Sequence, residues 1–231
     1  MDWFPLYNSM RIALFATVIV FFTGIFAAHR ICRLPRWVKG VLDVFLTLPL
    51  VLPPTVVGYF LLCVFGTKRP VGKWLLEALQ FKIPMEWYGG VLAAAVVSFP
   101  LMYRTARGAF ESFDQTLRYS AQTLGLSERY IFWRITMPAC RQGILAGTVL
   151  TFARALGEYG ATSMIVGYTP GKTATISTTV YQFWRTDNEV MAVRWIVVNL
   201  IISTVVLILV NMLEQRERKK KNRQTERDAW G

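Results

Sequence analysis

The sequence of 231 residues has little of the chemistry that enzymes and metal sites use. It contains one histidine, His29, and three cysteines, and these residues form no cluster with the spacing of metal ligands. Cys32 and Cys140 fall in basic segments predicted to face the cytoplasm, where thiols stay reduced, and Cys63 lies in an apolar stretch. We therefore interpret all three cysteines as structural and predict no metal site.

Patterns typical of catalysis and nucleotide binding are missing as well. The apolar stretches hold no paired carboxylates and no nucleophile beside a base, which predicts a non-catalytic chain. One candidate phosphate loop exists at residues 166–173 (VGYTPGKT), but it has Val166 where the P-loop pattern requires glycine, and no strand is predicted before it. We expect no nucleotide site in this chain.

Charged residues are absent from four long stretches, and these stretches predict the fold. A helix that crosses a bilayer needs about 17–25 apolar residues, and each of the four is of that length. A fifth stretch is equally apolar except for Arg154 and Glu158. The sequence therefore predicts an all-α, polytopic transmembrane helix bundle with about five spans, at about residues 10–29, 42–66, 88–107, 141–166 and 194–213.

The net charge of +12 comes from residues that lie between the predicted spans. They do not form one basic face interleaved with aromatic residues, so no nucleic acid partner is expected. Lys and Arg in alternate segments total 17 on one side and 8 on the other. Because cytoplasmic loops are enriched in Lys and Arg, the amino terminus is predicted outside and the carboxyl terminus, with the basic tail 214–231, in the cytoplasm.

The second predicted span contains Pro49, Pro53 and Pro54 within apolar sequence. Each proline removes a helix donor and crowds the preceding turn, so this span should be kinked or unwound. Carbonyl groups freed in a membrane must face protein or a water-filled path. Pro53 and Pro54 are therefore candidates for lining a pathway, and a purely structural kink is the alternative.

The fourth predicted span carries polar residues every three or four positions. A single helix would place them on one face, with Arg154 and Glu158 close enough to pair. Ionisable residues in a span are costly and are functional candidates by default. Either the ion pair fixes helix packing, or this face lines a path on which an oxyanion meets the arginine and threonine hydroxyls. The residues are Thr148, Thr151, Arg154, Glu158 and Thr162.

The longest internal cytoplasmic segment, residues 108–140, is predicted to dock a partner. Gly125 can take positive φ and end a short helix, and Ser127 can cap the next helix, which Pro138 is expected to break. Two short helices at an angle would form a protrusion with exposed aromatic and apolar side chains.

The same segment resembles the cytoplasmic signature of ABC-importer permeases, which reads E-A-A, three residues, Gly, nine residues, Ile, one residue, Leu-Pro. Met137 replaces the family's Leu. Two further stretches, 49–59 and 152–181, resemble molybdate permeases, with sulfate and tungstate permeases as near relatives. The matching positions of the signature are Ala121, Gly125, Ile135 and Pro138, while Tyr119 and Ser120 replace the family's Glu and first Ala.

The resemblance implies the membrane-spanning subunit of a type I ABC importer for molybdate in a bacterial inner membrane. Its implied partners are a second copy of itself, two cytoplasmic ATP-binding subunits that use ATP and Mg²⁺, and an extracytoplasmic oxyanion-binding protein. No cofactor is expected in this chain. Sulfate and tungstate remain alternative cargoes, and a passive anion channel is an alternative of another class. The outer segment 165–194 either contacts the binding protein, closes the outer mouth, or is a plain loop.

Overall fold

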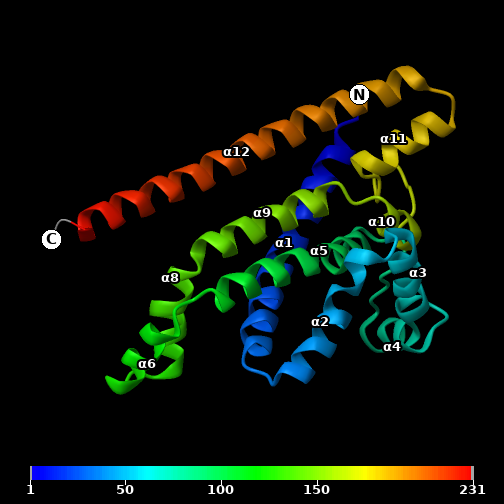
Figure 1. Ribbon diagram of the computed structural model, residues 1–231. Helices are drawn as coiled ribbons and strands as arrows, with labels where there is room; N and C mark the ends of the chain where they lie inside the picture. Colours follow the sequence, from blue (N-terminus) through cyan, green and yellow to red (C-terminus); the bar gives the residue numbers. More distant parts are fainter. Residues whose placement is uncertain (1, 230–231) are drawn as a thin grey trace.

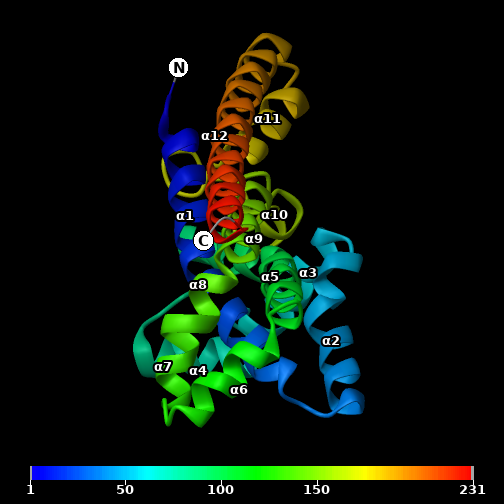
Figure 2. The ribbon, with the colours of Figure 1, turned by 60° about the vertical axis from the view of Figure 1, so that its left-hand side comes forward.

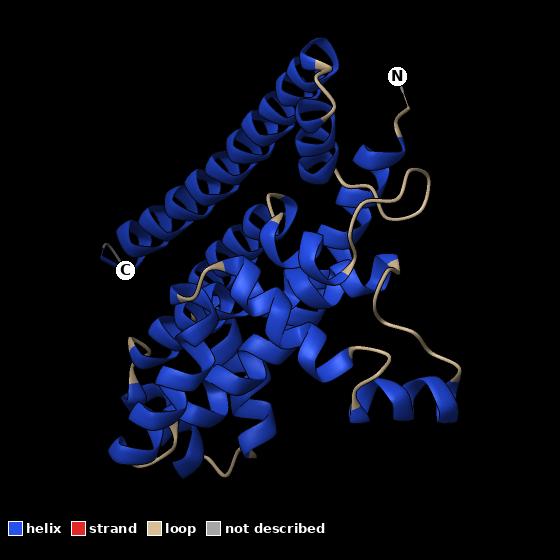
Figure 3. Cartoon of the chain, turned by 90° about the vertical axis from the view of Figure 1, so that its right-hand side faces the viewer, coloured by secondary structure: helices blue, strands red, loops and turns tan. Residues whose placement is uncertain are grey.

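The computed structural model describes residues 2–229, with side chains to Ile208 and that of Met212, and its regular structure there is helical (Figure 3). The expected all-α class is therefore confirmed. The helices are α1 Phe4–Cys32, α2 Arg36–Val51, α3 Pro54–Phe65, α4 Pro70–Leu79, α5 Trp87–Glu111, α6 Gln115–Thr123, α7 Glu128–Ile131, η1 Phe132–Thr136 (a π-helix), α8 Met137–Ala139, α9 Arg141–Leu156, α10 Gly160–Ile165, α11 Ile176–Arg185 and α12 Glu189–Ala229.

The centre of the molecule is formed by α1, α5 and α9, which pack against one another (Figure 1). Small residues face each other in this core, including Ala13 and Ala16 on α1 and Ala94 and Ala106 on α5, all fully buried. Lipid tails are as apolar as leucine, so membrane helices associate through close packing, which small residues permit. Large side chains on the outer faces of α1 and α9, such as Phe22 and Leu150, stay exposed, as expected for a surface that meets lipid.

Three helices are long and apolar enough to cross a membrane, namely α1, α5 and residues Glu189–Ile208 of α12, and a bent pair, α2 with α3, makes a fourth candidate. The fourth predicted span, 141–166, is divided between α9 and α10. Gly157, Glu158 and Tyr159 separate the two pieces, and α9 alone has 16 residues. The basic tail 214–231 continues α12 as far as Ala229; its side chains and residues 230–231 lie outside the described residues.

The predicted distortion of the second span is confirmed as a bend of 112° between α2 and α3. Pro49 stays inside α2, and the break falls at Leu52 and Pro53 instead. Leu52 is extended, with ψ at 142°, because the ring of the following proline disfavours the helical conformation. Pro54 then starts α3 at a position where its missing N–H costs nothing.

The two ends of the bundle are built differently. At one end, the Asn8 side chain donates to the Ala174 carbonyl at 3.0 Å and Ser9 Oγ accepts from the Ile176 N–H at 2.9 Å, so α1 is tied to the turn before α11. At the other end, Arg33 reaches Glu128 at the start of α7. Figure 2 shows α11 at one end of the molecule and α6 and α7 at the opposite end.

The segment 108–140 forms a compact helical unit at that opposite end. Gly125 has φ of +74° after α6, and Ser127 Oγ accepts the Tyr130 N–H, so the predicted helix end and cap are confirmed. The predicted break at Pro138 is wrong, because the chain stays helical to Ala139 and turns at Cys140. A π-helix precedes Pro138 instead, where the wider i→i+5 pattern leaves room for the proline ring.

Candidate functional site

The break between α2 and α3 meets the break between α9 and α10. A Cβ on Gly160, the first residue of α10, would lie 2.9 Å from Pro54 Cβ and 3.1 Å from the Thr55 nitrogen. A Cβ on Gly58 would lie 2.8 Å from the backbone of Ala161. Both glycines are therefore required for α3 and α10 to approach so closely, and two interruptions that are distant in sequence form one region.

Glu158 lies at the centre of this region, with its side chain 1% exposed. One carboxylate oxygen, Oε2, lies 2.6 Å from Arg154 Nη1, although without the geometry of a hydrogen bond. The other oxygen, Oε1, accepts the Ala161 N–H at 2.7 Å. The predicted ion pair is confirmed, and the same carboxylate also satisfies a free donor at the start of α10, which joins the two pieces of the divided segment.

The prediction that five polar residues share one helical face is wrong beyond Leu156, where α9 ends. Thr151, on α9, is fully buried with no hydrogen-bond partner for its hydroxyl among the described residues. Thr162, on α10, is also buried, and Thr148 donates to the Ile144 carbonyl of its own helix. A glycine directly before Glu158 was the signal in the sequence that the helix could stop there.

In the region where the helix breaks meet, the positive member of the ion pair is accessible and the negative member is not. The Arg154 side chain is 30% exposed, whereas its partner carboxylate is enclosed. Pro53 is exposed and Pro54 is partly exposed, so the α2–α3 break also reaches the surface of the chain. Guanidinium N–H groups that the ion pair does not use could hydrogen-bond an oxyanion there, with the buried carboxylate holding the arginine in place.

A second polar cluster between α2 and α5 was not predicted as a site. Arg107 on α5 pairs with Asp43 on α2, and the Tyr103 hydroxyl donates to the same carboxylate at 3.0 Å. Arg107 also binds Glu111 at 3.0 Å, and Glu111 in turn pairs with Lys39. The signal that could have indicated this cluster is an aspartate and an arginine at the ends of two neighbouring apolar stretches, since such charges need partners.

The signature residues of the 108–140 unit divide into two sets. Tyr119, at 60% exposure, and Ser120 present side chains to the outside, and Gly125 and Pro138 are also exposed. Ala121 is buried inside the unit, and Ile135 is partly buried against the helix core. The exposed set can meet a partner, whereas the buried pair holds the unit together.

One carboxylate organises the unit from within. Gln122 donates to Glu128 Oε1 at 2.6 Å, and Arg118 and Arg33 each place a guanidinium nitrogen 3.1 Å from Oε2. The hydrogen bond from Gln122, with the charges of Arg118 and Arg33, holds the pKa of Glu128 below its ordinary value of 4.5. Glu128 thereby joins the end of α1, α6 and α7.

Comparison with known sequences gives a consistent result. Residues 20–219 match the family described as binding-protein-dependent transport system inner membrane component. The chain is 38% identical to the molybdenum transport system permease protein ModB of Escherichia coli K12, over 96% of this chain and 97% of that protein. It is 34% identical to the sulfate transport system permease protein CysW of Synechococcus elongatus, over 84% of this chain and 67% of that protein.

Among solved structures, the chain resembles a bacterial ABC transporter involved in the import of the acidic polysaccharide alginate. The TM-score is 0.74 at 18% sequence identity, over 92% of this chain and 78% of that one. At this identity the similarity concerns the fold alone.

Proposed function

This chain belongs to the binding-protein-dependent inner-membrane components, the permeases of ABC importers, and from that premise we propose that its cargo is molybdate. As such a permease it is a non-catalytic, multi-pass protein of the inner membrane that carries no cofactor and acts in a complex with an ATPase and a binding protein. Membership in this family sets aside the passive channel as a reading of the sequence.

One observation favours molybdate over sulfate. The chain is 38% identical to the E. coli molybdenum permease over nearly the whole of both chains, whereas it is 34% identical to the cyanobacterial sulfate permease over 84% of this chain. Molybdate, tungstate and sulfate are all tetrahedral dianions, so a permease contact can suit any of them, and the choice is expected in the binding protein. Tungstate or sulfate as the cargo is therefore the alternative.

The two meeting helix breaks are our proposed part of the pathway, bordered by Pro53, Pro54, Thr151 and Thr162. We propose that Arg154 contacts the oxyanion and that buried Glu158 positions it. A neutralised arginine suits this task, because a bare cation in a low-dielectric path would bind a dianion too tightly for release. A helix break is also a place where short helices can shift as rigid pieces between states.

The two ends of the bundle are the surfaces that we assign to the partner proteins. We propose that Tyr119, Ser120, Gly125 and Pro138 lie on the surface that docks the ATP-binding subunit, with Ala121 and Ile135 supporting it from inside. This assignment makes the 108–140 end cytoplasmic and the α11 end external, where an oxyanion-binding protein would dock. Two copies of this chain with two ATP-binding subunits complete the proposed complex.

The test is ATP-dependent uptake into proteoliposomes that contain this chain, its copurified ATPase and the cognate binding protein. Labelled molybdate should enter only when ATP is present on the side of the membrane that carries the ATPase. Tungstate should compete with molybdate for uptake, whereas excess sulfate should not. Equal competition by sulfate would move the cargo to the sulfate relatives, and absence of any ATP-dependent oxyanion uptake would refute the proposal.

A further inference from the structure

An open groove of about 1020 Å³ runs along the second half of α1 and is closed on its other side by α7, η1 and α8. Its volume is at the upper limit of the about 300–1,000 Å³ of typical small-molecule sites. The groove is separate from the region where the helix breaks meet, because none of its lining residues belongs to α2, α3, α9 or α10.

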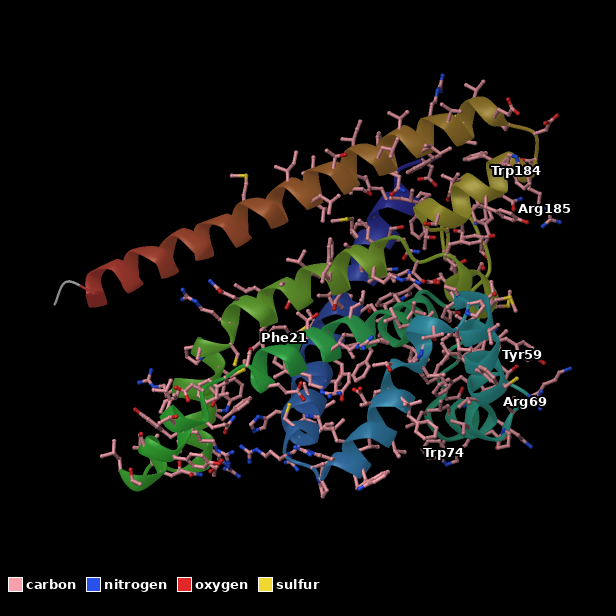
Figure 4. The ribbon with its side chains drawn as sticks, viewed as in Figure 1. Phe21, Tyr59, Arg69, Trp74, Trp184 and Arg185 are labelled. Carbon is pink, nitrogen blue, oxygen red and sulfur yellow. The ribbon has the colours of Figure 1, made fainter. Side chains whose placement is uncertain are left out.

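The walls of the groove are apolar and aromatic. Phe22 and Phe26 project from α1 with 63% and 60% exposure, and Trp133 projects from η1 with 62%. Phe21, labelled on α1 in Figure 4, lines the groove and also packs against the helix core, and Phe132 does the same from η1. An apolar surface of this extent would be unfavourable in water, so a lipid-like occupant suits it.

Cations gather where α1 ends and α7 begins. Arg30, Arg33 and Arg129 line the groove there with a single acid, Glu128, which is already shared by Arg33 and Arg118. Arg30 lies over the Phe26 ring, 4.8 Å from its centre. Neither Arg30 nor Arg129 has an ion-pair partner among the residues that the structure describes. Two positive charges at this end are therefore uncompensated.

The level of the charged end also fits a membrane interface. Trp133 of the groove and Trp37 at the start of α2 are both strongly exposed at this end of the bundle, and Trp3 and Trp184 are exposed at the other. Tryptophan is enriched at the two headgroup levels of a bilayer, and basic pockets between membrane helices bind anionic headgroups. The groove thus places apolar walls at acyl-chain depth and arginines at phosphate depth.

We propose that this groove binds one anionic phospholipid, with its acyl chains against Phe22, Phe26 and Trp133 and its phosphate between Arg30 and Arg129. A bound lipid would add a second connection between α1 and the 108–140 unit, beside the ion pair of Arg33 with Glu128. The inference requires that the chain lies in a membrane, but it does not depend on the cargo, so it can stand if molybdate is wrong.

The test is native mass spectrometry of the purified permease–ATPase complex titrated with phosphatidylglycerol and, separately, with phosphatidylcholine of the same acyl chains. We expect phosphatidylglycerol to bind about 25-fold more tightly, about five-fold for each of the two arginines, and this preference to be lost in Arg30→Gln/Arg129→Gln. The charge-preserving Arg30→Lys/Arg129→Lys should keep most of it.

The matched control removes two exposed arginines outside the groove, as Arg36→Gln/Arg185→Gln, and should leave the preference unchanged; Arg185 is labelled far from the groove in Figure 4. Equal binding of the two lipids, or equal loss in the control, would overturn the proposal. So would a photo-crosslinker placed at Trp133 that captures the ATPase or a second copy in place of lipid, since the groove would then be a protein interface.

Discussion

The region where α3 meets α10 and the 108–140 unit both consist of short helices separated by breaks, yet they are stabilised in different ways. In the first region glycines allow backbones to touch, and one buried carboxylate pairs with Arg154. In the second, Gly125 stands in open space and Glu128, with its side chain 45% exposed, collects partners at the surface. A helix interruption is thus tightly packed in one place and open to the surroundings in the other.

This difference suits the roles that we propose for the two regions. A region that surrounds a charged cargo must keep its donors in place, because a displaced arginine in a low-dielectric site is costly. A surface that follows a moving ATPase must instead transmit motion as a unit and can tolerate local change. Substitutions in the first region should therefore strongly lower stability. Substitutions in the second region should change stability little but should strongly reduce coupling to the ATPase.

The largest effect on stability is expected from breaking the buried ion pair. Arg154→Gln leaves the Glu158 carboxylate enclosed without its cation, which should cost about 3–5 kcal/mol of stability. Arg118→Gln, which removes one partner of the exposed Glu128, should cost less than about 1 kcal/mol. Thermal unfolding of the purified proteins in detergent measures both, and similar costs would remove the contrast between the two regions.

The double variant Arg154→Gln/Glu158→Gln separates packing from transport. It removes both charges while an amide oxygen can still accept the Ala161 N–H, so stability should recover relative to Arg154→Gln alone. If Arg154 contacts the oxyanion, uptake should stay at least about ten-fold reduced despite this recovery, the loss that removing a single charge-assisted contact typically brings. Recovery of uptake together with stability would leave the pair with a packing role only.

A smaller cost is expected from filling the contact between α3 and α10. Gly58→Ala adds a Cβ 2.8 Å from the Ala161 backbone and should lower stability by about 1–3 kcal/mol. Gly40→Ala is the matched control, because a Cβ there meets nothing within 4 Å, and it should be neutral or slightly stabilising. Unfolding temperatures of the two variants measure this difference. Equal unfolding temperatures would show that the close contact between α3 and α10 does not require a glycine at position 58.

Replacing Gly125 should change coupling to the ATPase rather than stability. Gly125→Ala forces a side chain into a left-handed conformation, at about 1–2 kcal/mol, but meets no neighbour. Gly171→Ala carries the same strain, with φ of +70° and open space, at the α11 end. Both proteins should insert normally, and ATP-driven uptake should fall in Gly125→Ala and further in Gly125→Pro, but not in Gly171→Ala. Normal uptake in the Gly125 variants would refute a coupling role.

Local rules predicted the features that depend on neighbours in sequence. The bend before Pro54, the helix end at Gly125, the cap at Ser127 and the pairing of Arg154 with Glu158 each follow from residues within a few positions of one another. They were confirmed for that reason.

Features that depend on distant segments could not be predicted in this way. Apolar composition made 141–166 look like one span. Gly157 marks a place where the helix could stop, but the close approach of α3 to Gly160 at the start of the new helix has no signal in the sequence. Asn8 looked like an ordinary residue before a span, yet it is fully buried because the turn at Ala174 folds onto it. The partners of these residues lie about 100 or more positions away, where periodicity carries no information.

The smallest effect is expected from the exposed cluster around Glu128, and pH can isolate it. The folded-state pKa of Glu128 is lowered, so its contribution to stability is present above the ordinary value of 4.5 and is lost as pH falls through the lowered pKa. The difference in unfolding temperature between the wild type and Glu128→Gln should therefore be small and constant near neutral pH and should vanish in acid. Glu77→Gln is the control, since its pair with Lys73 spans 3.7 Å with both side chains about two-thirds exposed, and should show no difference at any pH. A difference for Glu128→Gln that persists in acid would mean that the residue holds α6 and α7 by packing, and the unit would then be as rigid as the region around Glu158.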